Sequence, residues 1–122
     1  MIIGVGIDVV SIERIRRLLN KRGNDFLNRF FSSEEVNYIK NKKDPAPSLA
    51  ASFAAKEAFL KALGKGIGQG ISLKEISVER HTSGKPELKV ERKIVKERKI
   101  SNIHLSISHE EDVAIAIVII EN

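Results

Sequence analysis

The sequence predicts an α+β fold in which a small antiparallel sheet packs around one long central helix. Three observations support this prediction: an Ala- and Leu-rich segment in the middle of the chain, β-branched runs near both ends, and turn residues between these segments. With 122 residues, of which 42% are hydrophobic, the chain is long enough for one core and too short for two. We therefore expect residues 1–122 to form a single domain.

The central helix is predicted at residues 49–63, LAASFAAKEAFLKAL, which contain no Gly or Pro and are followed by Gly64. Ser48 is expected to cap this helix at its N-terminus. The segment is apolar around most of its circumference, and a helix of that kind is normally buried. Glu57 and Lys61 are therefore unusual within it.

Glu57, Lys61 and Gly64 share one stripe of this helix, because Lys61 lies roughly 40° and Gly64 roughly 20° from Glu57 at about 100° per residue. Two interpretations remain open. The first is an i,i+4 ion pair worth about 0.2 to 0.5 kcal/mol to the helix. The second is an acid and a base beside an anion site, at which backbone N–H groups of a glycine loop approach a phosphate. That loop, GKGIGQG, follows a helix rather than a strand, so it is neither a P-loop nor a dinucleotide fingerprint.

The N-terminal segment, residues 2–10, is a β-branched run that predicts a buried strand with Asp8 near its C-terminal end. Asp8 taken alone is best explained as a cap for the following helix, IERIRRLLNKR, for which Ser11 is also a candidate N-cap. That helix is expected to stop at Gly23.

The remaining elements follow from capping, proline and alternation signals. Ser32 to Glu35 have the form of a capping box, and two prolines in residues 42–47 predict a loop. His109 ends a predicted strand, where it is either a surface residue or faces a cleft. Helices are expected at residues 25–31, 33–42 and 92–99, and strands at 71–80, 87–91, 103–108 and 113–120, with a turn at 82–86.

The formal net charge of +5 favours an acidic partner, which could be a nucleic acid, an anionic lipid, an acidic protein or a phosphate ligand. No cysteine is present, which excludes disulfides and thiolate metal sites and is consistent with the cytoplasm. The N-terminus has no basic region of a signal peptide, and the longest apolar run is too short to span a membrane. We therefore expect a cytoplasmic protein without a membrane segment.

Four motifs together resemble one family. The segments are GVGIDVVSIERI at residues 4–15, FAAKEAFLKALGKGI at 53–67, GKP at 84–86 and SISH at 106–109. In this order and spacing they closely resemble holo-acyl-carrier-protein synthase, the small bacterial phosphopantetheinyl transferase family. None of the four would be specific alone.

The resemblance implies transfer of 4′-phosphopantetheine from coenzyme A to a serine of apo-acyl carrier protein, releasing adenosine 3′,5′-bisphosphate, with Mg²⁺ required. Asp8 and Glu57 match the family's metal carboxylates, and Lys61 matches its pyrophosphate-contacting lysine. These three are the candidate catalytic residues, and the general base stays open between Glu57 and a metal-bound water. The positions that match the coenzyme A cleft, besides Lys61, are Gly64, Lys65, Gly66, Gly84, Lys85, Pro86 and His109.

The resemblance also implies a homotrimer with active sites between subunits, and Arg14 matches a position that contacts the carrier protein. Arg14, Arg17 and Lys21 follow i, i+3, i+4 spacing, so we expect one basic row facing the acidic carrier. One position departs from the family: Ser52 stands where an arginine is common, and Lys42, Lys43 or Lys85 are candidates to replace its phosphate contact.

Two other classes of function are alternatives. A small basic nucleic-acid-binding module would use the net charge and the RKIVKERK segment. It leaves the two carboxylates without a role, and five Phe and one Tyr give no visible stacking platform. A scaffold that binds coenzyme A without turnover would share the cleft but not the chemistry.

Overall fold

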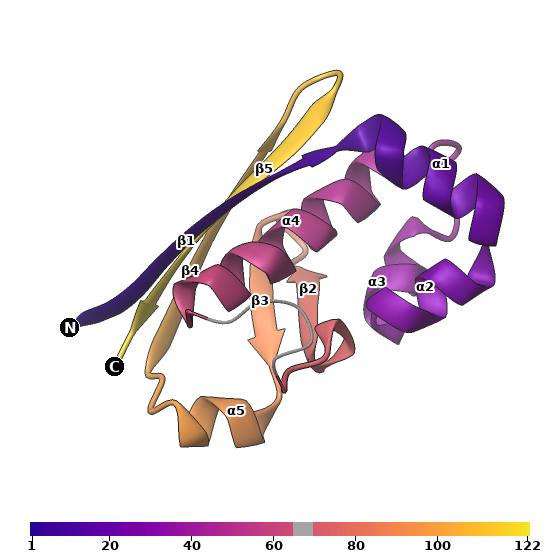
Figure 1. Ribbon diagram of the computed structural model, residues 1–122. Coiled ribbons are helices and arrows are strands. Elements are labelled where there is room, and N and C mark those ends of the chain that lie inside the picture. Colours follow the sequence, from indigo (N-terminus) through magenta and orange to yellow (C-terminus); the bar gives the residue numbers. More distant parts are fainter. Residues whose placement is uncertain (65–69) are drawn as a thin grey trace.

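One long helix lies against a three-stranded sheet and a separate hairpin in the computed structural model, which describes residues 1–64 and 70–122 (Figure 1). The predictions for Lys65, Gly66 and Gly68 lie outside these described residues. The large sheet is antiparallel with the order β1-β5-β4, and β2 pairs with β3. The strands are β1 (Ile2–Ser11), β2 (Ile76–Arg80), β3 (Pro86–Val90), β4 (Asn102–His109) and β5 (Val113–Glu121).

Three helices gather near the N-terminal end of the central helix α4, and a fourth lies away from them beside the hairpin (Figure 1). Within the described ranges no helix is long and apolar enough to cross a membrane. The α+β class predicted from the sequence is confirmed. The helices are α1 (Ile12–Arg22), α2 (Asn24–Phe30), α3 (Ser33–Ile39), α4 (Ala46–Ala62) and α5 (Arg92–Glu97), with a 3₁₀ turn at Leu73–Glu75.

Helix α4 is buried on nearly all sides because its alanines let neighbouring elements approach closely. Two glycines of β1 make the approach closer still. A Cβ atom on Gly6 would lie 1.9 Å from the carbonyl oxygen of Ala58, and one on Gly4 would lie 2.0 Å from that of Ala62. The backbone of β1 therefore rests directly on α4, and the side chain of Asp8, on the same face as Gly6, is brought to the helix.

The N-terminus of α4 corrects one prediction. The helix begins at Ala46, so Ser48 lies inside it and Pro45 is the N-cap residue. Prolines are compatible with the first turn because its N–H groups have no intrahelical acceptor. Asp44, rather than Ser48, provides an acceptor for a free N–H group of the first turn, since its Oδ1 accepts a hydrogen bond of 3.3 Å from the backbone N–H of Ala46.

Two other predicted helix caps, at α1 and α3, are present in the structure. The Oγ of Ser11 caps α1 by accepting from the N–H of Arg14 at 3.2 Å, so the suggestion that Asp8 caps this helix is wrong. The capping box of Ser32 and Glu35 is confirmed. Strand β2 begins only at Ile76, because the preceding residues form the 3₁₀ turn.

A buried ion pair joins α3 to α4. Lys56 and Glu35 are both fully enclosed, and the Lys56 Nζ also donates to the carbonyl oxygen of Phe30 at 2.7 Å. Glu35 accepts from the backbone N–H groups of Ser32 and Val78, each at 2.9 Å. Every polar atom of the pair is thus satisfied, and Lys56 is held so that the next residue, Glu57, projects from another side of α4.

The outer face of the large sheet is exposed and apolar. Ile7 and Val9 are 60% and 61% exposed, and they pair with Ile117 and Ile115 of β5, which are also exposed. Val5 continues the row toward the N-terminus. These five residues are called the outer sheet patch below.

Candidate functional site

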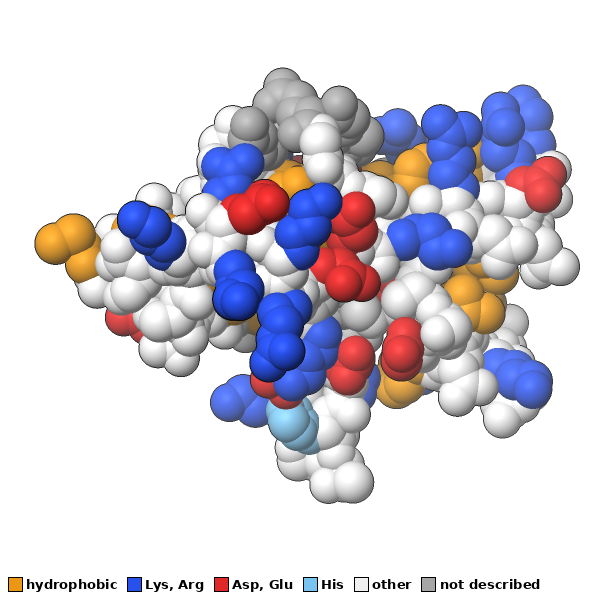
Figure 2. Space-filling view, turned by 90° about the horizontal axis from the view of Figure 1, so that it is seen from below, with side chains coloured by type: hydrophobic (Ala, Val, Ile, Leu, Met, Phe, Trp, Pro, Cys, Tyr) orange, Lys and Arg blue, Asp and Glu red, His pale blue; other side chains and the backbone are white. Residues whose placement is uncertain are grey.

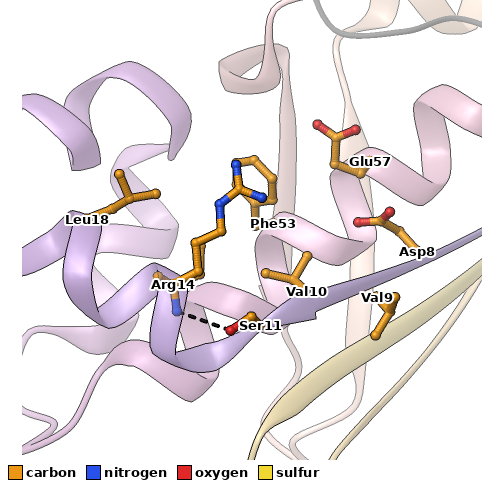
Figure 3. Close-up of a pocket in the computed structure, with 9 residues that line it drawn as sticks. Asp8, Val9, Val10, Ser11, Arg14, Leu18, Phe53 and Glu57 are labelled. Carbon is orange, nitrogen blue, oxygen red and sulfur yellow. Dashed lines mark hydrogen bonds between the residues drawn. The ribbon is translucent and has the colours of Figure 1, made fainter.

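Asp8 of β1 and Glu57 of α4 lie side by side where the strand crosses the helix (Figure 3). Lys61 joins them from the last turn of α4: its Nζ donates to Asp8 Oδ1 at 2.9 Å and to the carbonyl oxygen of Ile7 at 3.1 Å. The first interpretation of the stripe, an i,i+4 ion pair between Glu57 and Lys61, is therefore wrong, since the ammonium bonds Asp8 instead.

The carboxylate of Glu57 has one buried oxygen, Oε1. Its Oε1 is enclosed and accepts no hydrogen bond within the part of the chain that the structure describes. Burial raises the pKa of Glu57, the negative charge of Asp8 raises it further, and Lys61 acts in the opposite direction. A buried carboxylate oxygen of this kind is stabilised by a bound cation.

The two carboxylates fit a magnesium ion in donor chemistry. Mg²⁺ is usually held by one or two carboxylates, with water and substrate phosphates completing its ligands. Among the described residues no cluster of three or more His, Cys, Asp or Glu could hold a metal, so a dedicated all-protein cage is absent there. Asp8 and Glu57 would therefore hold such an ion with water or a phosphate ligand completing its coordination.

A pocket of about 280 Å³ opens beside the carboxylates, between the end of β1, α1 and α4. Asp8 and Glu57 form its acidic end, and the Arg14 side chain reaches in from α1 toward Phe53 (Figure 3). Its other walls are largely apolar. The lining residues are Asp8, Val9, Val10, Ser11, Arg14, Ile15, Leu18, Phe53 and Glu57.

The basic row predicted on α1 is present. Arg14, Arg17 and Lys21 are all exposed, whereas Arg16 between them is engaged with Glu13 at 2.6 Å and with Asp44 at 2.7 Å. Arg14 alone of the three lines the pocket. The row thus runs along α1 away from the carboxylates.

The predicted coenzyme A residues are more scattered. Gly64 follows α4 with φ 75°, and Gly84, with φ 89°, closes the turn between β2 and β3. Lys85 and Pro86 line a different groove, next to His104, while His109 ends β4. None of these residues lines the pocket of Asp8 and Glu57 within one chain.

The sequence reasoning missed the apolar wall of the pocket. Phe53 lies four residues before Glu57 and Leu18 four residues after Arg14, so each shares a helix face with a polar residue that was identified. The i,i+4 spacing was the available signal.

Comparison with known proteins identifies relatives along the whole chain. Residues 4–118 match the family model described as the 4′-phosphopantetheinyl transferase superfamily. A holo-[acyl-carrier-protein] synthase of Treponema denticola is 47% identical over 125 residues, covering 99% of both chains. One of Halothermothrix orenii is 46% identical over 122 residues, covering 98% of this chain and 97% of the relative.

Solved structures agree with the sequence relatives. The synthase from Neisseria meningitidis is 41% identical, covers 100% of both chains and gives a TM-score of 0.91. That from Helicobacter pylori, in complex with coenzyme A, is 35% identical over 96% of this chain and 99% of its own, with a TM-score of 0.88. A Bacillus anthracis synthase in complex with CoA (3′,5′-ADP) is 37% identical over 98% and 96%, with a TM-score of 0.84. This chain therefore belongs to the holo-[acyl-carrier-protein] synthases of the 4′-phosphopantetheinyl transferase superfamily.

Proposed function

We propose that this protein transfers 4′-phosphopantetheine from coenzyme A to a serine of an apo-acyl carrier protein. The observation that carries the proposal is the pairing of Asp8 and Glu57, with Lys61 beside them, at the mouth of a pocket in a chain of this family. Relatives solved with coenzyme A support the donor, and the name shared by the curated relatives supports the acceptor.

The reaction needs positioning and charge stabilisation more than covalent chemistry from the protein. The serine oxygen forms a bond to the pantetheine-side phosphorus, and the bond from that phosphorus to the bridging oxygen breaks. Adenosine 3′,5′-bisphosphate leaves with the bond's electrons, and the serine's proton passes to a base, for which the Glu57 carboxylate and a water molecule are the candidates. Lys61 is the cation beside the carboxylates, and we assign it to the pyrophosphate oxygens whose charge grows as the bond breaks.

We further propose that Asp8 and Glu57 hold a magnesium ion. The buried Oε1 of Glu57, which has no hydrogen-bond partner within residues 1–64 and 70–122, supports this assignment. When bound, Mg²⁺ would neutralise charge on the phosphoryl group under attack. The fold determines the position of the ion, since Asp8 is held by β1 and Glu57 by α4.

For the acceptor we propose the basic row of Arg14, Arg17 and Lys21 as the docking surface. Arg14 reaches from that row into the pocket, so a carrier bound on α1 would bring its serine to the carboxylates. Arg14→Glu should raise KM for the carrier several-fold, leave KM for coenzyme A unchanged and flatten the salt dependence. Lys93→Glu on α5 makes the same charge change elsewhere and should alter none of these. Equal effects on both substrates would move the docking surface away from α1.

A homotrimer is proposed on the outer sheet patch, because monomeric soluble proteins rarely expose so contiguous an apolar face. Subunit association would also account for predicted coenzyme A positions, such as Lys85 and His109, that do not line the pocket of their own chain. Ile7→Asp should convert a trimer to monomers in light scattering coupled to size-exclusion chromatography. A wild-type monomer would refute the proposal.

The transfer assay tests the central proposal directly. The protein is incubated with coenzyme A, Mg²⁺ and an apo-acyl carrier protein, and the carrier is weighed by mass spectrometry. A mass gain of one phosphopantetheine group is expected, and Asp8→Asn or Glu57→Gln should each abolish it with the fold intact. No gain with several apo-carriers would leave a scaffold that binds coenzyme A.

The nucleic-acid-binding alternative is set aside. It gives no role to Asp8 and Glu57, which the fold brings together. Figure 2 shows Lys and Arg interspersed with Asp and Glu on the face of the molecule seen from below in Figure 1, where α5 lies. The described residues of this face therefore form no continuous basic stripe of the kind by which proteins follow a phosphate backbone.

A further inference from the structure

We propose that Lys61 exchanges partners during the catalytic cycle: it neutralises Asp8 until a phosphate ligand draws it away, and a divalent cation then takes its place on Asp8. Lys61 would thus compete with the cation, and cation and phosphate ligand would promote each other's binding. This inference rests on the proposed function, because it concerns the same carboxylates and a phosphate-bearing substrate.

Lys61 neutralises one of the two neighbouring carboxylates, that of Asp8. Lys61 bonds Asp8 at 2.9 Å, while a buried oxygen of Glu57 has no hydrogen-bond partner in the part of the chain that the structure describes. A dication shared by Asp8 and Glu57 would meet the ammonium on the same carboxylate. Like charges at such short distance repel, so Lys61 opposes cation binding for as long as it stays on Asp8.

Lys61 is the member of the ion pair that can move. The Asp8 side chain is 15% exposed and belongs to a strand packed on α4, whereas Lys61 is 54% exposed and extends from the last turn of the helix. Its other acceptor is the carbonyl oxygen of Ile7 in β1, an edge strand of the sheet, where water can replace it. Lysine has a flexible four-carbon stem, so its departure from Asp8 requires no movement of the backbone.

The ammonium of Lys61 needs a new acceptor when it leaves Asp8. It needs another anion within reach of the carboxylates, and the phosphates of coenzyme A are the anions that the proposed function supplies. A phosphate that takes Lys61 leaves Asp8 free for the cation. By linkage, the factor by which phosphate strengthens cation binding equals the factor by which the cation strengthens phosphate binding.

A positioning role for Lys61 predicts the opposite sign. If the ammonium served to hold Asp8 in the orientation that the cation needs, removing it would weaken cation binding. A purely structural ion pair would leave cation binding unchanged. The direction of the change therefore separates the three roles.

The test uses Mn²⁺ as the probe, with free Mn²⁺ measured by electron paramagnetic resonance in the absence of coenzyme A. Lys61→Met should tighten Mn²⁺ binding by about twofold to fivefold, the range set by an ion pair whose lysine is more than half exposed. Lys89→Met is the matched control, because Lys89 is also 54% exposed and pairs with a carboxylate, Glu87, at 3.2 Å. It should leave Mn²⁺ binding unchanged, and Asp8→Asn should abolish it.

A second measurement adds coenzyme A to the same titrations. It should tighten Mn²⁺ binding in the wild type by a larger factor than in Lys61→Met, since only the wild type has an ammonium to draw away from Asp8. Unchanged or weaker Mn²⁺ binding by Lys61→Met, or equal coenzyme A effects in both proteins, would overturn the exchange. Circular dichroism confirms that each variant is folded.

The transfer assay distinguishes this failure from that of the proposed function. A wild type that modifies the carrier, combined with a Lys61→Met variant of unchanged Mn²⁺ affinity, would refute the exchange alone. A wild type that binds no Mn²⁺ at all, even with coenzyme A, would refute the shared cation site and the exchange together.

Discussion

Gly6→Ala tests whether the close contact of β1 with α4 is what assembles the site. The added Cβ would lie 1.9 Å from the carbonyl oxygen of Ala58 and 2.7 Å from the nitrogen of Ala62. An ordinary contact begins near 3.4 Å, so strand and helix must separate locally by about 1.5 Å. Both obstacles are backbone atoms in the last two turns of a buried helix, and neither can turn aside as a side chain would.

The expected cost in free energy of unfolding is about 3 kcal/mol, the upper end for overpacking a core. Gly6 lies two residues before Asp8 on the same strand face, so the separation also moves Asp8 away from Glu57. A displacement of about 1 Å between two ligands of one ion should weaken Mn²⁺ binding on the order of tenfold or more. Denaturant unfolding and Mn²⁺ titration measure the two effects separately.

Gly4→Ala is the comparison variant. The three atoms nearest to its Cβ would all belong to Ala62, the final residue of α4, the closest at 2.0 Å, and the end of a helix yields more easily than the turn before it. It also lies farther from Asp8 along β1. We therefore expect a smaller loss of stability and nearly unchanged Mn²⁺ binding. Wild-type unfolding and Mn²⁺ affinity for Gly6→Ala would refute the contact and the explanation of the site that depends on it.

Three further predictions concern charge and backbone conformation. Burial raises the pKa of Glu57 above the ordinary 4.5, so the folded protein becomes less stable relative to the unfolded chain as pH rises from that value. In EDTA at pH 7, Glu57→Gln should therefore unfold at a higher denaturant concentration than wild type. This difference should disappear below pH 4.5. Lys56→Met leaves Glu35 as a buried carboxylate without its ammonium partner and should lower the free energy of unfolding in denaturant by about 3 to 5 kcal/mol. Adding Glu35→Leu should not restore stability, because two backbone N–H groups then lose their acceptor. Lys99 has φ 56°, so Lys99→Gly should raise stability by about 0.5 to 1 kcal/mol in thermal unfolding, whereas Lys99→Ala should bring no gain.

Local signals predicted most of the elements, because helix caps, turns and alternation depend on residues a few positions apart. Ser11 and Gly23 bound α1, and the capping box of Ser32 and Glu35 begins α3, as expected from the sequence. The errors were at ends where a local signal had two meanings. Prolines near Ala46 were interpreted as a barrier to helix, although the first turn of a helix accepts them.

The sequence alone also determined that two carboxylates, Asp8 and Glu57, stand in apolar segments and need a partner or a cation. It could not decide which of them Lys61 would bond. Spacing along the helix favoured Glu57, but Asp8, 53 residues away in the chain, competes for the same ammonium once β1 lies on α4. That contact depends on the missing side chains of Gly4 and Gly6, and their effect exists only when strand and helix are packed together. Tertiary structure therefore decided the ion pair, and with it the buried oxygen of Glu57 that has no hydrogen-bond partner among the described residues.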